Sequence, residues 1–508
     1  MTAGNLADLV RRAADRFPAK AALLYQDQSV TWGEFEDQVS RAAGALASLD
    51  LAPGDRVAIA LGNTPAFPVC YFGALRAGLV AVPVNPASTS AELRHVLGDS
   101  GAIAVVGQRP FATLASELAA HLLELRHVIV VGDASPAPAG TLLLEELVES
   151  ARPLESPQGG SEDLALLIYT SGTSGRPRGA MLSHRALLAN LEQCSRIEPP
   201  VMSDDDVVLV VLPLFHIYGL NAALGMVAYH GATGVLVERF DPVDTLAIMR
   251  RHHVSNVVGA PPMYVAWSLL PDVGDAFADV RLAVSGAAPL PAQALTRFLD
   301  ATGHHVFEGY GLTETAPVLT STLMSAVAKP MSIGRAIPGV ELRLLNDSGG
   351  LAQEDDPGEI AVRGDNLFSG YWPDGAGGPD DSGWFRTGDV AYSDDDGDLS
   401  IVDRRRELIL VSGFNVYPRE VEDVLARHPG IEEAAVIGIA HPYTGEAVKA
   451  VVVRRPGVQL TADDVIAHCA LSLAAFKCPT TVEFAAGLPH SATGKTAKGR
   501  LRESAGGS

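Results

Sequence analysis

A loop rich in glycine and hydroxyl side chains follows an apolar stretch in the first half of the chain. Residues 169–179 read Tyr-Thr-Ser-Gly-Thr-Ser-Gly-Arg-Pro-Arg-Gly, directly after Leu164–Ile168. Glycines let the backbone amides turn inward, hydroxyls add donors, and Arg176 and Arg178 add positive charge. This pattern predicts a polyphosphate-binding loop, although it is not the usual P-loop because no Gly-Lys-Ser/Thr occurs at the required spacing. The alternative is a flexible linker, but linkers seldom run from a buried strand toward a helix capped by a residue such as Ser183.

Short apolar strands alternate with helices on both sides of this loop. Leu6–Phe17 has the apolar spacing of a helix, and Thr64–Ala77 is expected to form a helix between the strands Arg56–Leu61 and Leu79–Val84. Further strands are expected at Ala102–Val106, His127–Val131, Val207–Val211, Val235–Glu238, Val257–Gly259 and Arg281–Ser285. The alternation predicts an α/β fold whose large N-terminal domain has mostly parallel, helix-covered sheets.

The pattern changes near Val340 to strands interrupted by Gly and Asp, which predicts a small antiparallel unit. These strands are expected at Glu341–Leu345, Gly358–Arg363 and Asp398–Val402. A small α+β segment follows, with strands at Glu407–Val411, Glu433–Ile439 and Ala447–Arg454 and helices at Pro418–Arg427 and Ala462–Leu473. We predict a body over residues 1–402, a hinge at 403–406 and a C-terminal lid at 407–508 that ends in a loose tail, Ser504–Ser508.

The composition excludes several classes of protein. The 508 residues are 47% hydrophobic and 19% charged, which is typical of packed domains rather than disorder. A net charge of −22 disfavours general affinity for nucleic acid or an anionic membrane. The four cysteines are scattered, the N-terminus does not resemble a signal peptide, and the most apolar run, Val207–Phe215, is too short to span a bilayer. We expect a cytoplasmic protein with no nucleic-acid partner and no stable membrane insertion.

Several motifs in a fixed order give the chain a specific resemblance. The loop at 169–179 resembles the phosphate loop of the adenylate-forming superfamily, which includes acyl-CoA synthetases, amino-acid-adenylating domains and luciferases. The resemblance covers essentially the whole chain. It departs at Arg178, where the family usually has lysine, so the charge is kept and a different contact geometry is expected. The other motifs are Leu212–Gly219, Gly309–Thr315, Gly383–Asp389, Asp403–Gly413 and the closing Gly494-Lys495.

The resemblance implies a site for ATP and Mg²⁺. Tyr310 would offer an aromatic face to the adenine, Thr313 would donate to the α-phosphate, and Asp389 would accept from both ribose hydroxyls. Glu314 is the expected Mg²⁺ ligand. The full set expected to bind ATP is Thr170, Ser171, Gly172, Thr173, Ser174, Gly175, Arg178, Gly286, Ala287, Gly309, Tyr310, Gly311, Thr313, Asp389, Arg404 and Lys495.

The C-terminal segment carries residues to which the resemblance gives separate roles. Lys495 matches the lysine that reaches the substrate carboxylate and the α-phosphate, and it would stabilise the charge that develops as pyrophosphate leaves. We expect Lys495, Thr313 and His216 to be catalytic. Arg406 matches the hinge, while Ser412 and Gly413 match the loop around the pantetheine arm of coenzyme A. Taken singly, each charged residue has a simpler explanation as a solvated side chain.

The acyl pocket of the family is lined by the segment after the motif histidine and by nearby strand ends. The residues expected there are His216, Asn221, Gly225 and Gly309. Residues 216–226 are mostly small or apolar, which suits a hydrocarbon or aryl chain. Amino-acid-adenylating domains have an Asp where His216 stands, and malonate-activating relatives have an Arg where Gly309 stands. We therefore predict a medium- or long-chain fatty acid as substrate, with an aryl acid second.

Coenzyme A is the acceptor that the sequence favours. Relatives that stop at the adenylate or load a carrier protein have an insertion before the lid, and none is found between Pro338 and Trp384. A carrier-protein thiol is the second choice. A luciferase-like oxygenation would use the same adenylation residues, whereas a non-catalytic ATP- or acyl-binding relative would not need to keep Thr313, Glu314 and Lys495 together. The oligomeric state is open between monomer and homodimer.

Overall fold

The computed structural model divides into two compact units. The first comprises Met1–Pro330, Gly334–Glu341 and Arg363–Phe385, and the second comprises Met331–Ile333, Leu342–Val362 and Arg386–Ser508. The structure describes residues 4–132, 139–170, 177–325, 327–346, 348–353, 356–404, 407, 409–411, 414–441, 445–490 and 496–505.

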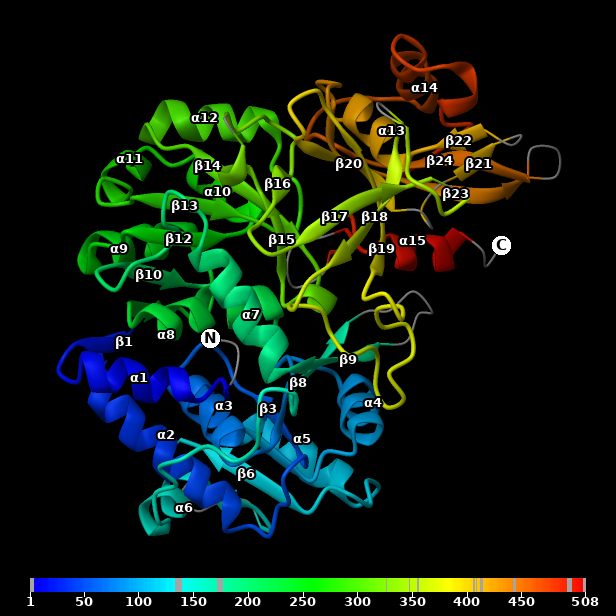
Figure 1. Cartoon of the computed structure of the whole chain (residues 1–508). Helices are drawn as coiled ribbons and strands as arrows, with labels where there is room; N and C mark the ends of the chain where they lie inside the picture. Colours follow the sequence, from blue (N-terminus) through cyan, green and yellow to red (C-terminus); the bar gives the residue numbers. More distant parts are fainter. Residues whose placement is uncertain are drawn as a thin grey trace. The chain divides into compact units, whose positions relative to one another are not determined.

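The first unit contains a nine-stranded sheet that is parallel through its centre (Figure 1). The neighbours from β14 through to β1 pair in parallel, whereas β2, β15 and β16 are antiparallel additions at the two edges. In spatial order the strands are β16 (Arg335–Ala336), β15 (Val318–Ser321), β14 (Val306–Gly311), β13 (Leu282–Ser285), β12 (Asn256–Gly259), β10 (Val207–Val210), β11 (Thr233–Leu236), β1 (Ala21–Tyr25) and β2 (Gln28–Thr31).

A seven-stranded sheet in the same unit is parallel except at one edge, where β8 and β9 form an antiparallel pair. Apart from polar residues at some strand ends, its central strands are apolar, as expected for strands buried on both faces. In spatial order they are β7 (Leu142–Leu143), β6 (His127–Val131), β5 (Ala104–Gln108), β3 (Arg56–Ala60), β4 (Val80–Pro83), β8 (Leu164–Thr170) and β9 (Arg178–Ser183).

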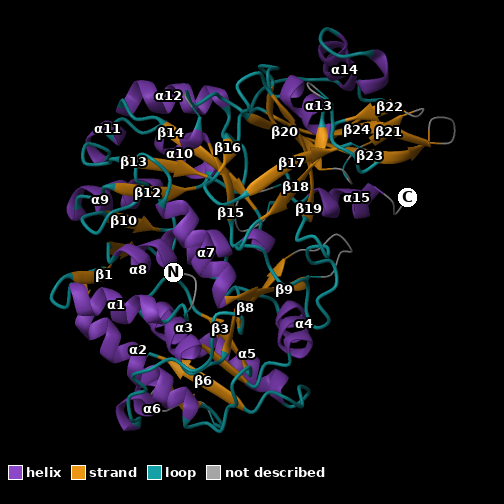
Figure 2. Ribbon diagram, viewed as in Figure 1, coloured by secondary structure: helices purple, strands orange, loops and turns teal. Residues whose placement is uncertain are grey.

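Helices pack against both sheets (Figure 2). Their starts are set by local capping: Thr31 and Glu34 form a capping box on α2, and Thr89 and Glu92 form one on α4. The helices are α1 (Asp8–Arg16), α2 (Trp32–Ala47), α3 (Ala66–Arg76), α4 (Ser90–Ser100), α5 (Arg109–Ala119), α6 (Leu144–Ser150), α7 (His184–Ser195), the π-helix η1 (Tyr218–Gly225), α8 (Met226–His230), α9 (Pro242–His252), α10 (Pro261–Trp267), α11 (Val273–Ala276), α12 (Ala292–Thr302) and the 3₁₀ turns η2 (Thr313–Thr315) and η3 (Thr322–Met324).

Helix α7 contacts both sheets of the first unit. It follows β9 of the seven-stranded sheet, with Ser183 as its N-cap. From its middle, Asn190 exchanges two hydrogen bonds with the backbone of Val318 in β15 of the nine-stranded sheet, at 2.8 and 3.1 Å. The side chain of Asn190 is buried, so these bonds satisfy polar groups that would otherwise be costly.

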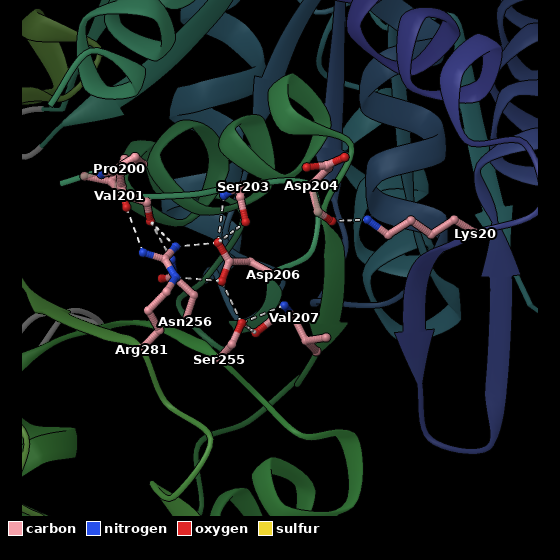
Figure 3. Close-up of polar contacts among 10 residues, drawn as sticks. All are labelled: Lys20, Pro200, Val201, Ser203, Asp204, Asp206, Val207, Ser255, Asn256 and Arg281. Atoms are coloured by element: carbon pink, nitrogen blue, oxygen red, sulfur yellow. Dashed lines mark hydrogen bonds and ion pairs between the residues drawn. The ribbon is translucent and has the colours of Figure 1, made fainter. Parts of the chain in front are cut away.

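An ion pair between the buried carboxylate of Asp206 and the partly exposed guanidinium of Arg281 connects the amino ends of the parallel strands β10, β12 and β13 (Figure 3). Asp206 accepts from Arg281 Nη2 at 2.5 Å, from Ser255 Oγ at 2.8 Å and from the Ser203 amide at 2.7 Å. Burial alone would raise the pKa of Asp206, but the hydrogen bonds from Arg281 and Ser255 outweigh it and lower that pKa. The stability that this carboxylate contributes is therefore present above its ordinary pKa and is lost as the pH falls through the lowered value.

We expect Asp206→Ala to lower the free energy of unfolding by about 2 to 3 kcal/mol, because it leaves Arg281 and Ser255 without their shared acceptor. Chemical denaturation at neutral pH measures the effect. The matched control is Asp27→Ala, which breaks the exposed ion pair with Arg251 and is expected to cost about 0.5 kcal/mol or less. Equal losses in the two variants would contradict the role given to Asp206.

The second unit contains a four-stranded sheet and a five-stranded sheet. Strands β19 and β20 form an antiparallel hairpin, which confirms the predicted antiparallel unit. The elements are β17 (Glu341–Leu345), β18 (Gly358–Arg363), β19 (Phe385–Ser393), β20 (Leu399–Arg404), β21 (Ile409–Val411), β22 (Phe414–Val416), α13 (Pro418–Leu425), β23 (Ile431–His441), β24 (Gly445–Arg454), α14 (Ala462–Ala470), η4 (Ala475–Lys477), β25 (Thr481–Ala485) and α15 (Lys498–Ala505).

The predicted fold class is confirmed, and the structure differs locally from the sequence analysis at three places. The predicted helix capped by Ser183 is confirmed as α7, but strand β9, which pairs antiparallel with β8, lies between it and the loop and was not predicted. The hairpin β1–β2 was not predicted. Ser504 lies in α15 rather than in a loose tail. The hinge at 403–406 stays a prediction, with Arg406 outside the described residues. Among the residues that the structure describes, no helix is both long and apolar enough to cross a membrane.

Candidate active site

The carboxyl ends of three parallel strands in the nine-stranded sheet carry the motif residues. Strand β10 leads into the segment ending at His216, β13 leads into Gly286, and β14 ends at Gly311. Because these strands are near neighbours in the order β14-β13-β12-β10, their carboxyl ends lie along one edge of the sheet. Ligands of α/β proteins bind at this edge.

A strained backbone marks the end of β13. Ala287 has a φ of 72°, a left-handed conformation that residues other than glycine seldom adopt. Gly286 beside it packs against the ring of Tyr218, because a Cβ at Gly286 would lie 2.9 Å from the Tyr218 Oη and Cζ atoms. Tyr218 thus joins the start of η1 to the segment predicted to line the adenine pocket.

The two glycines at the end of β14 have different reasons to be there. A Cβ at Gly311 would lie 1.8 Å from the Pro317 carbonyl oxygen, so only glycine fits the turn that leads to η2. A Cβ at Gly309 would meet only the Thr320 carbonyl oxygen, at 3.5 Å, which is an ordinary contact. Gly309 therefore leaves space that a larger side chain would fill. Tyr310 between them is half-buried.

Turn η2 presents Thr313 and Glu314. Thr313 is buried, whereas the Glu314 side chain is half-buried and accepts a hydrogen bond from Tyr371 Oη at 2.5 Å. The Glu314 carbonyl also accepts from the Phe368 amide at 3.0 Å. Among the described residues there is no cluster of three or more metal-binding side chains. A single carboxylate suits Mg²⁺ that takes its other ligands from phosphate oxygens and water.

Arg178 follows the predicted phosphate loop at the start of β9. Its guanidinium carbon lies 3.9 Å from the ring centroid of Tyr371, a cation–π contact. Thr170 lies opposite Arg178 in the β8–β9 pairing, so the two ends of the loop are adjacent. The loop residues Ser171, Gly172, Thr173, Ser174 and Gly175 lie outside the described residues.

His216 is a neutral imidazole at ordinary pH. Burial lowers its pKa to about 4. Its Nδ1 accepts from the Tyr218 amide at 3.2 Å, so the proton of the neutral ring sits on Nε2 and is available as a donor.

The segment before His216 is held by Asn63, which donates to the carbonyls of Val210 and Leu212 and accepts from the Leu214 amide. The sequence did not indicate this role for Asn63, because no local pattern links Asn63 to a motif that lies far along the chain.

Asn221 and Gly225 make contacts within η1, with α7 and with Ala316 after η2. The Asn221 amide donates to the carbonyls of Leu187 and Ala316, at 3.2 and 2.7 Å. A Cβ at Gly225 would meet Asn221 Oδ1 at 2.7 Å and the Leu191 side chain at 3.2 Å. These contacts explain both residues as packing of η1 against α7 and the turn after η2, so their place in the acyl pocket stays a prediction.

Two family models match the chain, one named AMP-binding enzyme over residues 10–372 and one named AMP-binding enzyme C-terminal domain over residues 420–495. The chain belongs to the AMP-binding enzyme family. It is an enzyme of the AMP-forming acid–CoA ligase group within the adenylate-forming superfamily.

Relatives of this AMP-binding enzyme differ in the acid they are named for. A long-chain-fatty-acid–CoA ligase from Yersinia pestis is 35% identical over 98% of this chain and 94% of its own length. A feruloyl-CoA synthase from an Amycolatopsis species is 37% identical over 97% of each chain. The ATP-bound structure of MatB from Rhodopseudomonas palustris is 32% identical, with a TM-score of 0.88 over 98% of this chain and 99% of that one.

The remaining predicted residues of this AMP-binding enzyme belong to the second unit. Asp389 is buried in β19, and its amide donates to Thr387 Oγ1 at 3.2 Å. The register of β19 and β20 pairs Asp389 with Arg404, so the backbone places these two motif residues side by side. Ser412, Gly413 and Lys495 lie outside the described residues, and their roles stay predictions.

Proposed function

We propose that this acid–CoA ligase activates an uncharged medium- or long-chain fatty acid. In the first half-reaction a carboxylate oxygen of the acid attacks the α-phosphorus of ATP, and pyrophosphate leaves. In the second half-reaction the thiolate of coenzyme A attacks the acyl carbonyl, and AMP leaves. The supporting observation is the open end of β14: Gly309 carries no cation for a second carboxylate and leaves space for a chain. An unpaired buried carboxylate would cost several kcal/mol there.

We assign the residues of the first unit to the first half-reaction. Thr313 donates to the α-phosphate, Arg178 holds the outer phosphates, and His216 donates from Nε2 near the reacting carboxylate. Mg²⁺ bound at Glu314 would neutralise phosphate charge as pyrophosphate leaves. The Gly286–Ala287 backbone and the face of Tyr310 hold the adenine.

We assign three further roles to the second unit. Asp389 and Arg404 hold the ribose, Lys495 stabilises the charge of the departing pyrophosphate, and Ser412–Gly413 admit the pantetheine arm of coenzyme A. A carrier-protein thiol is the second choice of acceptor.

An aryl acid is a second candidate substrate. The Tyr218 hydroxyl and the Ser285 hydroxyl are buried and find no hydrogen-bond partner among the described residues. Both flank Gly286, where they offer polar groups to a phenolic or other polar substituent. The similarity to a feruloyl-CoA synthase agrees with this alternative.

A substrate screen tests the proposed function. Pyrophosphate release is measured with fatty acids of increasing length, aryl acids, malonate and an amino acid, each with and without coenzyme A. We expect the highest kcat/KM for medium or long fatty acids. Faster release with malonate or an amino acid than with any fatty acid would contradict the proposal.

The variant Gly309→Leu tests the pocket directly. The added side chain has room for its Cβ, so the protein should fold, but it should occupy the space proposed for the acyl chain. We expect kcat/KM to fall roughly tenfold or more for long fatty acids and much less for short ones. A uniform loss across all chain lengths would place the pocket elsewhere.

A further inference from the structure

Tyr371, which no sequence motif singled out, contacts both the phosphate-loop arginine and the proposed metal ligand. Its hydroxyl donates to Glu314 Oε1 at 2.5 Å, and the Arg178 guanidinium carbon lies 3.9 Å from its ring centroid. The ring of Phe368 packs against it edge-on, with centroids 5.1 Å apart. The phenol therefore meets a carboxylate at its tip, a cation on its face and an aromatic ring beside it.

The backbone of Tyr371 is paired on both sides. Residues 369–372 pair with β9, through the Ala180–Tyr371 bridge and a bond from the Trp372 amide to the Gly179 carbonyl at 2.8 Å. On the other side, Tyr371 and Ala376 form a second bridge. With its backbone paired and its ring packed against Phe368 and Arg178, Tyr371 can hold a neighbouring carboxylate in one orientation.

We propose that Tyr371 is a positioning residue for the Glu314 carboxylate, and that Arg178 acts on this carboxylate through Tyr371. The inference rests on the proposed function, in which Glu314 holds the metal of the nucleotide. The phenol occupies one carboxylate oxygen with a charge-assisted hydrogen bond, which leaves the other oxygen for the metal. Partners of this kind typically change metal affinity by about 10- to 100-fold when removed.

The same arrangement explains why arginine replaces the usual lysine at position 178. A planar guanidinium can stack on an aromatic face while its edge still offers donors to phosphate, whereas an ammonium is a point charge on a flexible stem. Arg178 and Tyr371 are therefore matched in this chain. A phosphate that binds Arg178 is thereby coupled, through Tyr371, to the Glu314 carboxylate that holds the metal.

Binding of ATP in the absence of any acid tests the proposal without turnover. Calorimetry gives the Kd of ATP with excess Mg²⁺ and with EDTA, and the ratio of the two values reports how strongly metal and nucleotide are coupled. We expect Tyr371→Phe to weaken binding of Mg·ATP roughly tenfold and to leave metal-free ATP within about twofold of the unmodified protein. Tyr25→Phe is the matched control, because it removes a phenol–carboxylate bond to Glu238 outside the site.

Glu314→Gln separates failure of this inference from failure of the proposed metal site. If Glu314→Gln weakens Mg·ATP and Tyr371→Phe does not, Tyr371 has no positioning role. If neither variant weakens Mg·ATP, the metal assignment is wrong and this inference falls with it. Equal weakening of ATP with and without metal in Tyr371→Phe would indicate a general structural role and would overturn the proposal.

A double-mutant cycle tests the link from Arg178. Arg178→Lys keeps the charge and loses the stacking. It should therefore reduce the ratio of the affinity for Mg·ATP to the affinity for metal-free ATP. In the Tyr371→Phe background that ratio should no longer respond to Arg178→Lys, because the phenol through which Arg178 acts is absent. An undiminished effect of Arg178→Lys on the ratio in that background would show that Arg178 does not act through Tyr371.

Discussion

Lys495→Ala is expected to lower acyl-adenylate formation from acid and ATP by roughly a thousandfold while sparing the transfer of a preformed acyl group to coenzyme A. A cation that bridges the substrate carboxylate and the α-phosphate stabilises charge that exists only in the first half-reaction. Transfer from a supplied acyl-adenylate to a thiol develops no charge on departing pyrophosphate. Single-turnover kinetics of each half-reaction measures the two effects separately.

Gly413→Leu should have the reciprocal effect, because it crowds the proposed path of the pantetheine arm. It should release pyrophosphate normally in the first turnover and slow the thioester step.

Because Lys495 and Gly413 both belong to the C-terminal segment, we expect this segment to change position about Arg406 between the two steps. Lys477→Ala is the control: its ammonium pairs with Glu420 within the same segment, and neither residue belongs to a motif. Equal loss of both half-reactions in a folded Lys495→Ala protein would contradict this division of labour.

Glu314→Gln is expected to slow adenylation on the order of a hundredfold without unfolding the protein. The amide keeps an oxygen that can accept from Tyr371, so the local packing is retained. It loses the negative charge with which Glu314 would bind Mg²⁺. The rate of pyrophosphate release is measured as a function of Mg²⁺ concentration, with thermal unfolding as the check on folding.

The matched control for Glu314 is Glu238→Gln. Glu238 also accepts a hydrogen bond from a tyrosine, Tyr25, but lies outside the motifs. We expect its adenylation rate and Mg²⁺ dependence to be unchanged. A Glu314→Gln enzyme with an unaltered rate and an unaltered Mg²⁺ requirement would assign the metal to another residue.

The central sheet strands were predictable because their signal is local. His127–Val131, for example, is strand β6 with unchanged bounds, since a short apolar run between turn residues is enough to indicate a buried strand. Strand β9 could not be predicted in this way, because Arg178–Ser183 shows no strong apolar pattern and owes its conformation to pairing with β8. Tertiary context decides such segments.

In the candidate site, too, residues marked by a local sequence pattern could be predicted, and residues that depend on tertiary contacts could not. Motif residues such as Thr313 and Glu314 could be found because the family pattern keeps them together in sequence. Tyr371 and Asn63 could not, because each acts on a residue distant in the chain: Tyr371 on Glu314, and Asn63 on the backbone around Leu212. The role of a side chain that supports another residue depends on the fold, which no local spacing encodes.

The measurement that tests the central claim most directly is the identity of the nucleotide product. The enzyme is incubated with ATP, Mg²⁺ and a medium- or long-chain fatty acid, first without coenzyme A and then with it. We predict one equivalent of pyrophosphate and enzyme-bound acyl-adenylate in the first stage, then equal amounts of AMP and acyl-CoA in the second. Formation of ADP and phosphate, or thioester formation without release of pyrophosphate, would contradict the account.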